Sequence, residues 1–245
     1  ESQHARAHHA ADPLYAAMRT LRQQKQGDHI PAACATCHNP RDTTDHESPA
    51  ARGGVTCATC HQLAAVHPGG GRRGTGALEV GPEKVFRGPH DIANGVSPVH
   101  GNGKALRELV DGTTLCMACH AEEHNPAGQP TCTTGIEHAA VHGASSCTSC
   151  HMEEVPGPSG PVSARATHRS HAFRGPHHAL RTSSTAFLES AVRLSGRFEG
   201  NRFTAVMDNR SQHGFPTGFP ARMAVLEIRG RDAAGNEVFR NITDD

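Results

Sequence analysis

The chain has 245 residues, of which 36% are hydrophobic and only 4% aromatic, and its 26 glycines and 16 prolines favour loops over long helices and strands. Lysine and arginine together number 24, as do aspartate and glutamate, so no basic surface predicts nucleic-acid binding. No run of 18 apolar residues is present, which excludes a predicted membrane span.

The first predicted element is a helix over 13–26. Leu14, Met18 and Leu21 recur at helical spacing, and Gly27 follows as a stop signal. We expect this apolar stripe, Met18 included, to face the protein core.

Four copies of Cys-x-x-Cys-His come next in the chain. Their thiols are Cys34 and Cys37, Cys57 and Cys60, Cys116 and Cys119, and Cys147 and Cys150, and their histidines are His38, His61, His120 and His151. This is the spacing of c-type haem attachment, in which two thiols form thioether bonds and the histidine binds the iron from one face. Zinc sites and thioredoxin-like motifs also use CxxC, but neither accounts for a histidine after the second cysteine in all four copies. We therefore predict four covalently bound haem c groups, each with its iron.

Four haem groups would supply the apolar surface that this chain lacks for an ordinary hydrophobic core. We expect them to form the core of a mainly irregular and α-helical haem-binding domain over 1–160, whose apoprotein is largely unfolded. A second helix, over 103–110, is predicted to lead into the third motif. The short spacing between the first two motifs, and between the last two, predicts two pairs of neighbouring haems.

The pattern changes after the fourth motif. A segment rich in glycine and proline covers 155–161, a linker with ligand histidines is predicted over 161–185, and a small all-β module with an Ig-like sandwich fold over 186–245. Its expected strands are 187–198, 202–208, 223–229 and 237–242, with a turn at 232–236. About four strands rarely close a sandwich, so the open edge needs a partner, either further chain or a strand added by another subunit.

Each iron needs a second axial ligand unless it is left open for chemistry. Of the 20 histidines, four belong to the motifs, which leaves 16 that can bind a haem iron, against only five methionines. Ligation by two histidines, with low-spin haems of low potential, is therefore the prediction.

The segments around the motifs resemble those of the cytochrome c554-like multihaem family. They are SQHARA at 2–7, DPLY at 12–15, GVTC at 54–57, SPVH at 97–100, CHM at 150–152 and SHAFRGPH at 170–177. HGFPTG at 213–218, with Arg222, is similar to an element appended to such cytochromes in a C-terminal β-module.

The resemblance implies which histidines are the distal ligands. They are His4, His100, His171 and His213, with His90 and His177 in reserve because each ends a repeated FRGPH sequence. Family members usually have a CxxCH unit before the segment equivalent to 2–7. His4 is therefore expected to serve a haem of this chain, of an upstream segment or of a neighbouring subunit.

The expected function is electron transfer through closely spaced haems, without catalysis. The chain would be exported, because haem c is attached after export, and would act in the periplasm or outside the cell. Its partners would be other redox proteins or further copies of itself, in a filament with strand or ligand exchange between subunits. The alternative is an oxidoreductase that acts on small nitrogen or sulfur compounds at an open haem. No CxxCK unit supports it, and Tyr15 is expected to pack on its helix.

Overall fold

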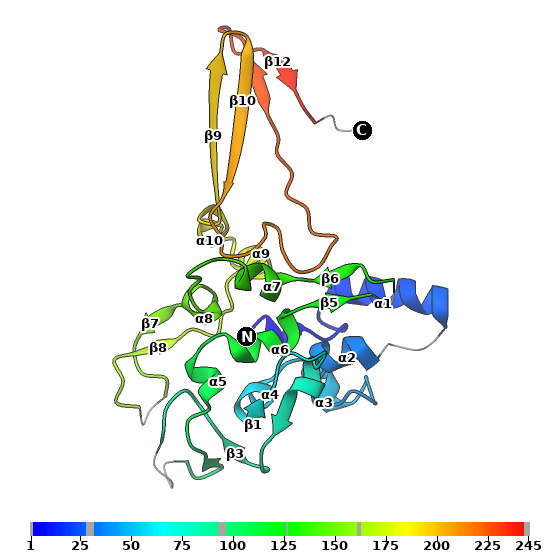
Figure 1. Cartoon of the computed structure of the whole chain (residues 1–245), viewed down its shortest axis with the longest axis vertical. Helices are drawn as coiled ribbons and strands as arrows, with labels where there is room; N and C mark the ends of the chain where they lie inside the picture. The colour runs from blue at the N-terminus through cyan, green and yellow to red at the C-terminus, as the bar shows by residue number, and fades with distance from the viewer. Residues whose placement is uncertain (1, 28–31, 93–96, 126, 161–162, 243–245) are drawn as a thin grey trace.

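Short helices and strand pairs joined by loops form a body from which one long hairpin projects (Figure 1). The structure is a computed structural model that describes residues 2–27, 32–92, 97–125, 127–160 and 163–242. The first short element is the 3-10 helix η1, His4–Arg6, which runs into the body.

The predicted first helix is confirmed as α1, Pro13–Gln26. The Asp12 carboxylate caps it by accepting from two backbone N–H groups, and Gly27 ends it with a φ of +82°. The expectation that Met18 lies in a core is wrong, since Met18 is 41% exposed. Leu14 and Leu21, on the same stripe, are exposed to a similar extent. Tyr15, about 100° around the helix from Leu14, makes the contact with the first motif instead, by stacking on His38.

Each CxxCH motif forms a short helix with its histidine as the last residue. These helices are α2 (Ala32–His38), α4 (Cys57–His61), α6 (Thr114–His120) and α8 (Cys147–His151). The remaining helices are α3 (Pro49–Arg52), η2 (Gly74–Ala77), α5 (Arg107–Val110), α7 (Thr134–Ala139), α9 (Pro176–Thr182) and α10 (Ala186–Glu189). Only the last turn of the helix predicted over 103–110 forms, as α5. Helix α6 lies centrally, in contact with α5, α7, η2 and β1.

The strands of the body form separate two-stranded pairs. They are β1 (Leu63–Val66) with β2 (Leu78–Val80), β3 (Val85–Phe86) with β4 (Gly101–Asn102), β5 (Glu123–His124) with β6 (Pro130–Cys132), and β7 (Glu154–Pro156) with β8 (Thr167–Arg169). Only the β3–β4 pair is parallel. The buried apolar cluster is small, as the composition predicts: Leu63, Val66, Ala77, Leu106 and Ala118.

The C-terminal part differs from the predicted Ig-like sandwich. It contains a hairpin of β9 (Val192–Glu199) and β10 (Arg202–Asn209) and a separate pair of β11 (Arg229–Arg231) and β12 (Glu237–Arg240). The expected first strand begins with helix α10 instead, and 223–228 belong to no strand. The turn at 232–236 is confirmed, with the Asp232 carboxylate accepting from the backbone of Ala234 and Asn236. Alternating residues identified the strands, but pairing between strands is decided by tertiary contacts.

The projecting hairpin has one apolar face. On this face Phe198 lies opposite Phe203, Gly196 opposite Ala205 and Leu194 opposite Met207, whereas the other face of the two strands is charged and polar except for Val206. Phe198 is 75% exposed, so no element of the described chain covers this face fully.

Candidate haem centres

The four motifs meet around α6. The Cys37 thiol of the first motif lies beside the Cys119 thiol of the third, and the Cys116 thiol of the third lies beside the Cys147 thiol of the fourth. The contact between the third and fourth motifs was predicted from spacing, whereas that between the first and third was not. None of the nine cysteines is in a disulfide, which leaves the eight motif cysteines available for thioether bonds.

Three of the four motif histidines face another histidine at nearly the same distance. The ring centres are 6.1 Å apart for His61 and His171, 6.1 Å for His151 and His213, and 6.2 Å for His120 and His4. Two imidazoles bound on opposite sides of one metal ion, each with a metal–nitrogen bond of about 2 Å, have ring centres roughly 6 Å apart. The three pairs therefore have the spacing of two axial ligands that share one iron.

Backbone carbonyls accept from the Nδ1 atoms of three motif histidines and of two histidines that face them. The Nδ1–H groups of His38, His61 and His151 donate to the carbonyls of Ala7 (2.9 Å), Arg87 (2.6 Å) and Arg174 (2.6 Å). On the distal side, His171 and His213 donate to Arg169 (3.1 Å) and Gly214 (2.8 Å). Because a carbonyl only accepts, the proton lies on Nδ1 and the Nε2 lone pair is left for a metal ion.

The surrounding protein keeps several of these rings neutral. Desolvation lowers the pKa of His120, His151 and His171, and it lowers that of His4 to about 4. An imidazole binds iron only in its unprotonated form, so these environments suit metal ligation.

The HGFPTG element is docked on α7 through Glu137. Its carboxylate accepts from the backbone N–H of Gly214 (2.8 Å) and from the Thr217 hydroxyl (2.6 Å), and also from the Thr133 hydroxyl. Although desolvation opposes it, these hydrogen bonds lower the pKa of Glu137. The docking places His213, at the start of the element, against His151.

His38 differs from the other motif histidines. Its ring stacks on Tyr15, with ring centres 4.2 Å apart, and within the described ranges no histidine faces it at the spacing of the three pairs. Tyr15 packs there as expected, and burial, with the neighbouring Cys34 thiol, raises the pKa of its hydroxyl to about 12.

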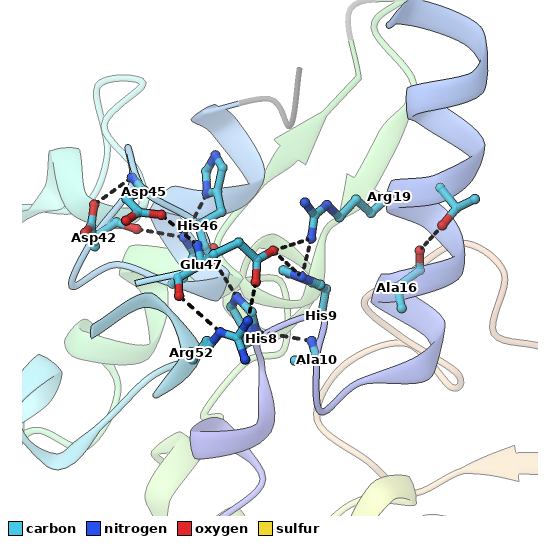
Figure 2. Close-up of polar contacts among 12 residues, drawn as sticks. His8, His9, Ala10, Ala16, Arg19, Asp42, Asp45, His46, Glu47 and Arg52 are labelled. Carbon is cyan, nitrogen blue, oxygen red and sulfur yellow. Dashed lines mark hydrogen bonds and ion pairs between the residues drawn. The ribbon is translucent and has the colours of Figure 1, made fainter. Parts of the chain in front are cut away.

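A polar cluster fixes the segments on either side of the first motif (Figure 2). His8 is fully buried, its Nε2–H donates to the His46 carbonyl (2.7 Å), and its Nδ1 accepts from the Ala10 backbone. With both nitrogens bonded to the backbone, His8 has no lone pair left for iron. His9 contacts Arg19 and Glu47 in the same cluster.

The other predicted distal histidines have no facing motif histidine in the described part of the chain. His100 contacts Phe86, with ring centres 5.0 Å apart, and its Nδ1–H donates to the Gly101 carbonyl. His90 is exposed, and the Nε2 atom of His177 contacts Arg222. The assignment of ligands to individual irons stays a prediction.

Sequence reasoning missed the role of the two FRGPH repeats. Their terminal histidines were considered as ligands, but their arginines make the contact with the motifs. The Arg87 backbone accepts from the His61 ring and donates to the His61 carbonyl (2.7 Å), and Arg174 does the same with His151 (3.1 Å for the second bond). The repetition itself was the signal for two equivalent loops, and only the structure identifies the atoms.

The residues present fit the predicted haem groups. Besides free thiols and paired imidazoles, the Nδ1 atom of His4 and the Nε atoms of Arg19, Arg22 and Arg174 are buried without a hydrogen-bond partner among the described residues. Arg19 and Arg174 are also ion-paired, with Glu47 and Glu153, and their Nε–H groups suit the carboxylates of haem propionates. No group of three or more His, Cys, Asp or Glu side chains in these ranges is arranged to hold a metal ion by itself.

Comparison with known proteins identifies a class of fold. Among solved structures, a penta-haem cytochrome c552 from Thermochromatium tepidum is similar, with a TM-score of 0.75 and 24% identity over 99% of this chain and 69% of that chain. No family model and no curated protein matches. The chain therefore shares its fold with a multihaem c-type cytochrome. In the described ranges no helix is long and apolar enough to cross a membrane.

Proposed function

We propose that this chain is a tetrahaem c-type cytochrome that carries electrons through haems bound mostly by two histidines. The observation that carries the proposal is the set of three histidine pairs at 6.1–6.2 Å, each containing the histidine of a CxxCH motif. The haem groups, when bound, supply one-electron redox chemistry. The chain supplies thioether thiols, axial imidazoles and the carbonyls that orient them.

Two measurements on the purified protein test this proposal. Iron and haem analysis should give four haems per chain with a c-type absorption band in the reduced state. The EPR spectrum of the oxidised protein should be mainly that of low-spin haem. A colourless product, one that contains zinc in place of iron, or a mainly high-spin spectrum contradicts the proposal.

Further proposals concern location and partners. The chain acts in the periplasm or outside the cell, because haem c is attached after export, and it resembles cytochromes of the c554-like family with a C-terminal β-module. Its partners are other redox proteins or copies of itself.

Two features of the described chain support the filament variant: two histidines without a facing partner, and an exposed hairpin. His38 has no facing histidine, and His100 has no facing motif histidine, while α2 and β3 beside them lie apart in Figure 1. The hairpin also exposes an apolar face and an open strand edge. A neighbouring copy would contribute His100 to the His38 site and a strand to the hairpin. Electron microscopy tests this variant, since filaments support it and discrete particles refute it.

His38 also supports the alternative function. An iron bound by His38 alone would have an open position, as an oxidoreductase acting on small nitrogen or sulfur compounds requires. Binding of cyanide or nitric oxide to the reduced protein would favour this alternative. Absence of binding would favour a pure electron carrier.

A further inference from the structure

Residues 170–174 contain one strained backbone position between three of the motifs. Phe173 has a φ of +49°, in the left-handed region that a residue with a Cβ atom seldom adopts. Such strain persists where surrounding contacts require it, and it is concentrated at functional sites.

Residues of this turn contact candidate ligands of the second, third and fourth motifs. Just before Phe173, His171 faces His61 of the second motif, with ring centres 6.1 Å apart. Just after it, Arg174 exchanges two backbone hydrogen bonds with His151 of the fourth motif. The Phe173 ring itself packs edge-on against His4, with ring centres 4.1 Å apart, and His4 faces the third motif.

The turn is anchored on the fourth-motif side. The Arg174 guanidinium forms an ion pair with Glu153 (2.6 Å) and donates to the Cys150 carbonyl (3.2 Å). With Arg174 fixed, the direction in which the backbone leaves Phe173 decides where His171 lies.

We propose that Phe173 is a positioning residue that couples the axial ligands of the second, third and fourth haems. This inference rests on the proposed haem-binding function. The left-handed turn presents the His171 ring and the Arg174 carbonyl together, and the aromatic ring sets the position of His4. Because hydrogen bonding at Nδ1 and ring orientation tune an imidazole ligand, a change at Phe173 alters spin state and reduction potential at several haems together.

The chain contains its own comparison for this position. Phe86 begins the other FRGPH repeat, and its Arg87 makes the same two backbone bonds with His61. Phe86 lies in the extended strand β3 instead of a left-handed turn. A β-branched residue is favourable in a strand and strongly disfavoured at positive φ.

The experiment compares Phe173→Val, Phe173→Gly and Phe86→Val in the haem-loaded protein at equal haem content. EPR and spectroelectrochemical titration are the readouts, and the single variants His4→Ala, His171→Ala and His213→Ala assign the signals to haems. Phe173→Val should open the turn, giving new high-spin signal and shifted potentials at the second, third and fourth haems. Phe173→Gly tolerates the left-handed turn and should change only the third haem, and Phe86→Val should change none of these three.

Several results would overturn the inference. They are an equal response to valine at both positions, a response of one haem alone to Phe173→Val, and a Phe173→Gly variant that matches Phe173→Val. If the valine variant does not mature, Phe173→Thr replaces it, because threonine is also β-branched and therefore strongly disfavoured at positive φ. Haem content and the low-spin spectrum of the unchanged protein test the proposed function separately.

Discussion

Removal of the Glu137 carboxylate should weaken the hold on His213. Two of the hydrogen bonds that Glu137 accepts, from Gly214 and Thr217, connect α7 to the HGFPTG element. Hydrogen bonds to a charged acceptor contribute about 1.5–3 kcal/mol each, and since this carboxylate is half-exposed we take the lower figure for both, about 3 kcal/mol in total. Glu137→Ala should therefore increase the population of the undocked element on the order of a hundredfold.

The assay is a spectrophotometric titration of the oxidised protein with cyanide. In the proposed haem-loaded protein, cyanide would compete for the iron held by His151 only when His213 is displaced, so its apparent affinity would scale with the undocked population. Glu137→Ala should increase that affinity on the order of a hundredfold, and Glu137→Gln, which keeps one acceptor oxygen, should have an intermediate effect.

Glu189 provides the matched control for this experiment. It accepts from the Thr185 hydroxyl four residues earlier, as Glu137 does from Thr133, but no bond from it to the HGFPTG element is present in the described chain. Glu189→Ala should leave cyanide binding unchanged. Equal affinities for cyanide in Glu137→Ala and Glu189→Ala would refute the role of Glu137 in holding His213.

Three further changes have defined outcomes. Tyr15→Ala should lower the free energy of unfolding by roughly 2 kcal/mol through loss of the stack on His38, and Tyr15→Phe by much less, as thermal denaturation would show. Gly112→Ala should destabilise the contact between the third and fourth motifs by about 2 kcal/mol or more, because Gly112 has a φ of +67° and a Cβ atom there would overlap the Thr148 hydroxyl. Hydrogen bonds, the first of them from the Asp45 backbone, lower the pKa of Asp42 from 3.8 to about 2. Its stabilising effect is present above pH 4 and lost as the pH falls through 2, so the stability difference between the protein and Asp42→Asn should close over that interval.

The sequence singled out the residues of the candidate centres but did not predict their arrangement. CxxCH spacing singled out the thiols and motif histidines, and the apolar spacing with Gly27 as a stop located α1 to the residue. The resemblance to multihaem cytochromes singled out His4, His171 and His213, which the structure brings to motif histidines. Which motif each would face was not predictable, since the pairs join residues far apart in the chain.

Other features depend on contacts that side-chain patterns do not encode. The orienting groups at His61 and His151 are backbone carbonyls, which every residue possesses, so residue identity did not reveal them. The stripe that includes Met18 has helical periodicity, but periodicity does not tell which face of α1 meets the first motif. The predicted sandwich failed in the same way, because strand-forming residues do not specify which strands pair.

Short backbone links between candidate ligands take the place of a large apolar core. His4 faces His120 while Ala7, three residues later, holds His38, and His171 and Arg174 repeat this arrangement for the second and fourth motifs. Each of these short segments can order the chain only if the histidines that it connects are held in place, which the proposed haems would do. Few aliphatic residues are buried, and Leu63 and Leu106 are the largest of them. Their burial alone stabilises the fold too little to offset the entropy lost when these segments become ordered. A chain in which the eight motif cysteines are replaced by alanine should therefore lack cooperative thermal unfolding by circular dichroism. A cooperative transition in that chain, with the helix content of the haem-loaded protein, would show that the polypeptide alone specifies the fold.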